Sequence, residues 1–197
     1  TMTAKIKLNA ASGGGSFSLQ APSSSSNNRV FTLPDIADAT MATVNGITMA
    51  DQWRLTTGYT ASGAALLIAN WERNDNSNYA KIGTGMSESS GIFSFPLTGV
   101  YYIQFQARGL SSGGARAYSG IYIQTGVSGT YTNVADAYDS SSADGYYFNV
   151  TTATIFDVTD TSTHTIRFNV DTSGSTLYSG NSNKNETFVT FLRLGDT

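Results

Sequence analysis

The segment GIFSFPLTGVYYIQFQARGL, residues Gly91–Leu110, is the most informative part of the sequence. Proline fixes φ and has no N–H to give to a sheet, so Pro96 belongs just before a strand, and Gly99 supplies the turn. Apolar side chains then alternate with polar ones: Ile103, Phe105 and Ala107 against Gln104, Gln106 and Arg108. This alternation predicts a turn followed by a strand with one buried face.

Short strand-like runs follow one another from residue 58 to the end of the chain. Turn residues separate them, and no helical period is sustained. The expected strands are Ala65–Trp71, Gly91–Phe95, Gly99–Ala107, Tyr118–Thr125, Gly145–Thr151, Ala153–Val158, Thr163–Asp171 and Glu186–Leu194. Many short strands between turns predict an all-β sandwich.

The composition argues against several classes of function. The 197 residues are 40% hydrophobic and 13% charged, with a net charge of -3. No cluster of lysine and arginine supports contact with nucleic-acid phosphates, and no apolar run is long enough to span a membrane. Cysteine is absent, which favours assembly in a reducing cytoplasm. We therefore expect neither nucleic-acid binding nor membrane insertion.

Residues 1–57 differ from the rest of the chain. Three short alternating runs are separated by a triple glycine and a serine-rich turn. The runs are Lys5–Leu8, Ser16–Gln20 and Arg29–Leu33. Strands so short and few cannot bury a core of their own, and residues 38–53 are interpreted as a connector. The sequence thus predicts an extended β-arm and connector over 1–57, ahead of a domain at 58–197.

The pattern Phe-x-x-Pro-x-x-Gly-Val-Tyr-Tyr, from Phe93 to Tyr102, resembles the centre of the C1q-like globular head, a jelly roll related to the tumour necrosis factor fold. Residues Asn70–Phe105 (NWERNDNSNYAKIGTGMSESSGIFSFPLTGVYYIQF) are similar to the bacteriophage branch of this family, and Glu186–Leu194 resembles its C-terminal core strand. Unlike the vertebrate branch, the chain has no collagen-like repeat and no cysteine. The resemblance implies a trimeric jelly-roll knob that binds and assembles without covalent chemistry.

The segment GGGSFSLQAPSSSSNNRVFTLPDIAD, Gly13–Asp38, resembles a module that precedes knob domains in structural proteins of tailed bacteriophages, especially marine ones. The resemblance implies that residues 1–57 attach the knob to the virion and help it to trimerise, and that 58–197 form the C1q-like knob. A flexible polar linker with incidental alternation is the alternative reading of this segment.

Together these resemblances imply a non-enzymatic homotrimer on the virion surface, made in the host cytoplasm. It would be a capsid decoration protein, or a short fibre or receptor-binding knob, anchored to other virion proteins of the capsid or tail by its N-terminal arm. A glycan or protein of the host cell surface is the expected receptor. A soluble bacterial carbohydrate-binding module is the alternative, and it predicts a monomer.

Alternation within the strands divides side chains between the core and the opposite face. Tyr102, Gln104 and Tyr122 should point away from the core. In the resembling family the corresponding face packs around a threefold axis, so we expect Tyr102, Gln104, Tyr122 and Phe191 to line contacts between subunits. Ordinary exposed tyrosines are the alternative.

Receptor binding would fall on loops, since loops carry function while the sandwich carries stability. The candidate loops are Asn74–Asn78, Gly109–Ala115, Gly126–Tyr131 and Asp136–Asp144. Within them the candidate residues are Asn76, Ser112, Tyr131, Tyr138 and Asp139.

No residue pattern indicates catalysis or a resident cofactor. Asp136, Asp139 and Asp144 lie in one segment, VADAYDSSSADGYY, and carboxylates of this kind are ligands for Ca²⁺. Their spacing does not match a twelve-residue calcium loop, so a solvated loop with Asx turns is the alternative. His164 is the single histidine, and a surface position at the start of a strand explains it better than a catalytic base.

Overall fold

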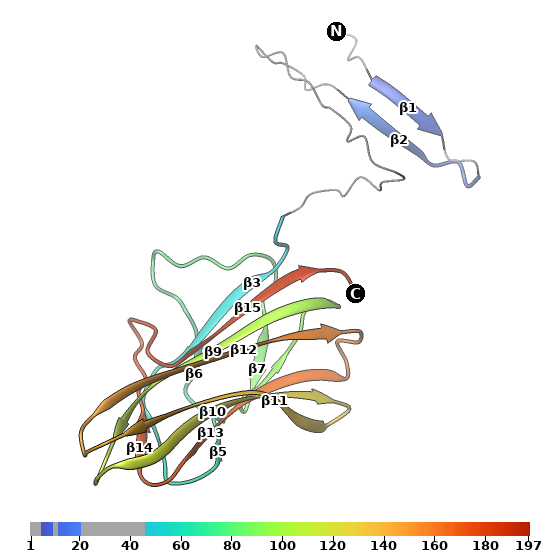
Figure 1. Ribbon diagram of the computed structural model, residues 1–197. Helices are drawn as coiled ribbons and strands as arrows, with labels where there is room; N and C mark the ends of the chain where they lie inside the picture. The colour runs from blue at the N-terminus through green and yellow to red at the C-terminus, as the bar shows by residue number, and fades with distance from the viewer. Residues whose placement is uncertain (1–4, 10–11, 21–45) are drawn as a thin grey trace, which may run out of the picture. The chain divides into compact units, whose positions relative to one another are not determined.

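The computed structural model describes residues 5–9, 12–20 and 46–197, and these residues form strands without a helix. The chain divides into two compact units, Thr1–Thr43 and Val44–Thr197 (Figure 1). This division precedes the boundary expected after residue 57, because the strand Ala50–Leu55 (β3) belongs to the second unit. Nothing in the described ranges is a helix long and apolar enough to cross a membrane.

The first unit contains an antiparallel hairpin. Its strands β1 (Lys5–Asn9) and β2 (Ser16–Gln20) pair with Lys5 opposite Gln20 and Asn9 opposite Ser16. Gly13 and Gly14 lie in the turn between the strands with φ of 84° and 71°, a backbone conformation that other residues disfavour. Two of the three strands predicted for the arm therefore form and pair. The third, Arg29–Leu33, lies outside the described residues.

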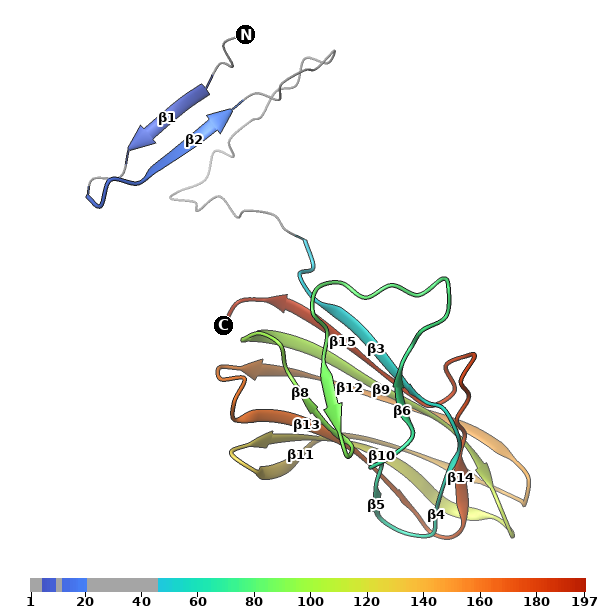
Figure 2. The ribbon, with the colours of Figure 1, turned by 180° about the vertical axis from the view of Figure 1, so that it is seen from behind.

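Two antiparallel sheets make up the second unit, and Figures 1 and 2 show them as two layers. The six-stranded sheet has the order β11 (Thr130–Ser141), β10 (Arg116–Val127), β13 (His164–Thr172), β8 (Ile92–Ser94) and β7 (Ser87–Ser89), with β5 (Ala65–Leu66) also paired to β13. The seven-stranded sheet has the order β4 (Tyr59–Ala61), β14 (Thr176–Tyr178), β9 (Gly99–Ser111), β15 (Phe188–Gly195), β3 and β6 (Trp71–Arg73), with β12 (Tyr147–Val158) on the other side of β9. The expected all-β jelly-roll sandwich is confirmed.

Strand β9 follows the predicted alternation along its whole length. Its odd-numbered residues are buried and its even-numbered residues are half-buried. The strand begins at Gly99 with φ of 141°, and a Cβ there would lie 2.4 Å from the backbone oxygen of Gly195. Only glycine fits this close approach, which lets β9 pair with β15 from its first residues.

The core between the sheets is built around phenylalanines. Phe93 of β8 lies 5.5 Å from Phe168 and 5.4 Å from Phe191, measured between ring centroids, and Phe105 lies 5.0 Å from Phe168. All four side chains are fully buried. Burying each contributes about 1.5–3 kcal/mol, so this cluster joins β9 and β15 of one sheet to β8 and β13 of the other.

Several elements differ from the sequence prediction. The expected strand Ala65–Trp71 is replaced by two short strands, β5 and β6, and the three-residue strands β4, β7 and β14 were not predicted. Residues 147–158 form one strand, β12, where two were expected. Residues 130–141 form β11, where loops were expected, and residues 50–55 form β3, which was assigned to the connector. Aspartate and serine lower the strand propensity of β11. At the edge of a sheet these residues are useful, because charges there discourage pairing with a second chain.

Candidate functional site

The outer face of the seven-stranded sheet carries an apolar row. Paired residues on β12, β9, β15 and β3 place Ile155, Tyr102, Leu192 and Ala50 side by side across four strands. Ile155 is 65% exposed, and the other three side chains are half-buried. Ile155 stands at the β12 end of this row, and a continuous exposed apolar row of this kind is a candidate for contact with another surface.

A polar row lies next to the apolar one. Ala153, Gln104, Thr190 and Gln52 pair across the same four strands. Gln52 Nε2 donates to Thr190 Oγ1 at 2.9 Å, which orients the amide along the sheet. An apolar strip bordered by amides and hydroxyls is typical of an interface with an apolar centre and a hydrogen-bonding rim.

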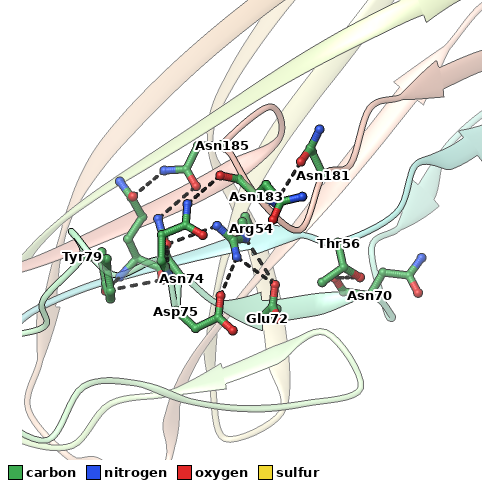
Figure 3. A network of polar contacts seen from close by, with 12 residues as sticks. Arg54, Thr56, Asn70, Glu72, Asn74, Asp75, Tyr79, Asn181, Asn183 and Asn185 are labelled. Atoms are coloured by element: carbon green, nitrogen blue, oxygen red, sulfur yellow. Dashed lines mark hydrogen bonds and ion pairs between the residues drawn. The ribbon is translucent and has the colours of Figure 1, made fainter.

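One end of this face is closed by a network around Arg54, drawn in Figure 3. The Arg54 side chain is fully buried, and its Nη2 lies 3.1 Å from Glu72 Oε2 and 2.7 Å from Asp75 Oδ1. Its Nη1 donates to Asn74 Oδ1 at 3.1 Å. Two carboxylates and an amide thus pair with the buried guanidinium, because burying this charge without partners would be strongly unfavourable.

The segment 181–185 covers the same end. Asn74 Nδ2 donates to Asn185 Oδ1 at 3.3 Å, and Asn185 in turn donates to Gln52 (Figure 3). Asn76 Nδ2 donates to the carbonyl of Asn183 at 2.5 Å. Asn76 was expected on a receptor-binding loop. In the structure, this hydrogen bond holds Asn76 against the segment 181–185.

The residues predicted for subunit contacts do not share one face. Tyr102 and Gln104 lie on the outer face of the seven-stranded sheet, as expected for the strand that holds them. Tyr122 lies on β10 in the other sheet, so it cannot join them in one patch. Phe191 is 0% exposed within the aromatic core, so its assignment to subunit contacts was wrong.

The sequence analysis missed Ile155 and Leu192 of the apolar row. The signal was present: in ATIFDV, the isoleucine occupies a position whose neighbours in alternation, Ala153 and Asp157, are small or charged. Ile155 and Leu192 lie on either side of Tyr102 because β12 and β15 flank β9. This sheet order cannot be read from alternation.

The remaining receptor candidates lie in two kinds of place. Ser112 is exposed in the turn between β9 and β10, where its N–H donates to the carbonyl of Ser175 at 3.0 Å. Tyr131, Tyr138 and Asp139 lie within strand β11, so the predicted loops there are corrected to an edge strand.

Two of the three aspartates proposed for calcium accept hydrogen bonds from separate backbone N–H groups. Asp139 Oδ1 accepts from the N–H of Ser140 at 2.7 Å, and Asp144 Oδ1 accepts from the N–H of Gly113 at 2.6 Å. Over residues 5–9, 12–20 and 46–197 no three acidic, histidine or cysteine side chains gather as a metal site would require. The structure therefore provides no ligand cluster for calcium at Asp136, Asp139 and Asp144.

His164 begins β13 and contacts hydroxyl groups. Its Nδ1 lies 3.0 Å from Thr163 Oγ1, and its Nε2 lies 3.4 Å from Thr159 Oγ1. Its ring packs on Phe156, with centroids 5.6 Å apart. A catalytic histidine is oriented by a carboxylate on one nitrogen, and threonine hydroxyls occupy both positions here.

No protein-family model matches the sequence, and no curated protein matches it. Solved structures do match. Murine APRIL at pH 8.5 is 14% identical with a TM-score of 0.54, and the match covers 74% of this chain and 98% of that chain. Eiger TNF from S. frugiperda is 13% identical with a TM-score of 0.58, over 77% of this chain and 96% of that chain. Identities this low show the fold alone: the chain has a tumour necrosis factor-like jelly roll.

Proposed function

We propose that this chain is a non-enzymatic homotrimeric protein of the virion surface of a tailed bacteriophage. It acts as a capsid decoration protein, or as a short fibre or receptor-binding knob. The N-terminal unit, Thr1–Thr43, anchors it to other virion proteins, and the knob faces outward.

The observation that carries the proposal is the apolar row on the outer face of the seven-stranded sheet. Ile155 is 65% exposed in a single chain, Tyr102 lies beside it on β9, and Leu192 lies beside Tyr102 on β15. Burial of such a strip against a second copy contributes about 25 cal/mol for each Å² of apolar surface removed from water. The C1q-like resemblance implies a threefold arrangement at this face.

The virion role is supported by the sequence resemblances of Gly13–Asp38 and Asn70–Phe105 to phage structural proteins. The β1–β2 hairpin suits an anchoring role, because two short strands gain stability when a partner surface adds to them. Three such arms on one trimer would bind far more tightly than one.

Immunogold or cryo-electron microscopy of purified phage particles whose genome encodes the chain tests this proposal. Label on the head at threefold positions supports a decoration protein, and label at the tail or fibre ends supports a receptor-binding knob. Particles without label, together with a monomeric chain in solution, would contradict the proposal and favour the carbohydrate-binding module.

A further inference from the structure

A cavity of about 240 Å³ opens on the outer face of the six-stranded sheet. Its polar lining comes from three adjacent strands, β10, β11 and β13. The lining residues used below are Tyr122, Gln124, Asn133, Asn169 and Asp171. Pairing of Tyr122 with Asn169, and of Gln124 with Asn133, fixes their side-by-side placement. The lining thus combines a phenol, three carboxamides and a carboxylate.

One of these groups lacks a partner. Within the described part of the chain, Asn169 Oδ1 is buried from solvent and receives no hydrogen bond. Buried acceptors are nearly always satisfied in folded proteins, because leaving one unpaired sacrifices its hydration. Asn169 also lines the cavity, so rotation of its amide toward a ligand donor would supply the missing bond.

The neighbouring carboxamide is held in a defined orientation. Gln124 Nε2 donates to Asn133 Oδ1 at 2.6 Å, and Gln124 Oε1 accepts from Arg167 Nε at 2.6 Å. The Arg167 guanidinium carbon lies 3.8 Å from the centroid of the Tyr131 ring, so this cation is held in place by stacking. A polar group positioned before the ligand arrives loses little entropy on binding.

An aromatic platform borders the cavity. Tyr138 is 51% exposed, and its ring centroid lies 5.7 Å from that of Tyr122 and 6.1 Å from that of Tyr118. Its ring crosses Gly120 on the paired strand, where a Cβ would come within 2.6 Å of a ring carbon. The two hydroxyls of Tyr122 and Tyr138 are hydrogen-bonded, and burial raises the pKa of Tyr122, so its phenol stays protonated.

We infer that this face binds a neutral saccharide, with one sugar ring in the cavity and the adjoining ring against Tyr138. Carboxamides and a carboxylate match the donors and acceptors of sugar hydroxyls, and tyrosine rings offer an apolar surface with a polar edge to the C–H face of the sugar. Asp171 in the lining and Asp136, paired with Tyr122, outnumber the single Arg167 cation beside Gln124 and disfavour phosphate, sulfate and sialic acid. The cavity is smaller than the roughly 300–1,000 Å³ of sites that enclose a larger ligand, which favours a single ring.

This inference deepens the proposed function by naming the ligand class, and it rests on that function only for the biological setting. The cavity lies within one chain, so saccharide binding is expected with or without trimers. Conversely, a chain that forms trimers and binds no saccharide would overturn this inference alone.

The test begins with the full chain on an array of neutral hexose and N-acetylhexosamine oligosaccharides and their sulfated and sialylated counterparts. We expect binding among the neutral oligosaccharides. Binding to none of them, or only to the acidic ones, would overturn the inference. If the cavity bound a protein or peptide instead of a saccharide, the inference would be overturned as well.

Titration calorimetry with the best neutral oligosaccharide then locates the site. Asn169→Ala removes the unpartnered acceptor, and Tyr138→Ala removes the exposed platform. Each should raise Kd about tenfold or more, the effect of losing one well-placed contact. Asn149→Ala, an exposed asparagine on the other sheet, is the matched control and should leave Kd unchanged. Unchanged Kd in both cavity variants would overturn the assignment of the site.

Discussion

At the scale of single residues, Asp51 is the polar centre of one edge of the sandwich. The carboxylate is 2% exposed. Its donors are Arg73 Nε at 3.0 Å, Trp53 Nε1 at 3.0 Å, Tyr79 OH at 3.0 Å, and the backbone N–H groups of Met86 at 2.8 Å and Gln52 at 3.0 Å. These hydrogen bonds compensate the burial of the carboxylate and join β3 to the segment leading into β7.

Removal of one of these donors gives a direct test. Tyr79→Phe deletes the hydroxyl that donates to Asp51 and accepts from the N–H of Gln52 at 2.7 Å. We expect the free energy of unfolding to fall by about 1–3 kcal/mol, because hydrogen bonds to a charged group are stronger than neutral ones. Urea unfolding measures the change. Tyr146→Phe, at a 57% exposed tyrosine, is the control and should stay within about 0.5 kcal/mol. Equal effects would contradict the role of Tyr79.

The same tyrosine links stability to alkaline pH. Burial and the neighbouring Asp51 carboxylate raise the pKa of Tyr79 from 10.0 to about 12. The unfolded chain therefore loses its proton before the folded chain does, and the free energy of unfolding falls between pH 10 and pH 12. Burial also raises the pKa of Tyr101, Tyr122 and Tyr178, so Tyr79→Phe should reduce this fall without abolishing it. A fall of the same size in both proteins would show that Tyr79 is not linked to folding.

At the scale of elements, the start of β9 depends on Gly99. Gly99→Ala would place a Cβ 2.4 Å from the backbone oxygen of Gly195, at a φ of 141° that side chains rarely adopt. We expect a loss of about 1–3 kcal/mol in unfolding free energy and a lower thermal midpoint. Gly63→Ala is the matched control, because its Cβ would meet open space. If both variants unfolded at the same temperature, the close approach of β9 and β15 would not be a constraint.

Strand prediction from the sequence succeeded where alternation was strong and failed where it was weak. Strand β9 was evident because its buried and half-buried residues alternate without interruption. Strand β11 was missed because Asp136, Asp139 and its serines are typical of turns, and only its pairing with β10 holds them in a strand. Strand β3 was missed because its buried charges, Asp51 and Arg54, are satisfied by residues far along the chain.

At the scale of the whole molecule, the faces of the sandwich could be predicted only in part. Alternation correctly turned Tyr102 and Tyr122 away from the core, but it does not say that β9 and β10 belong to different sheets. The assignment of Phe191 overlooked a signal in the sequence, because Val189 and Phe191 alternate with Thr190 and Leu192. The cavity around Asn169 joins three strands, so only the tertiary structure reveals it.

The proposed function depends most directly on association through the outer face of the seven-stranded sheet. Ile155→Asp places a charge in the apolar row, and burying an unpaired charge in an interface is strongly unfavourable. Val127→Asp, at a 45% exposed valine on the other sheet, is the control.

Sedimentation equilibrium of the full chain and both variants is the decisive measurement. We predict that the unmodified chain and Val127→Asp have three times the 20.9 kDa mass of one chain, and that Ile155→Asp has the mass of one. A monomeric unmodified chain at every concentration, or an Ile155→Asp variant that remains trimeric, would contradict association through this face.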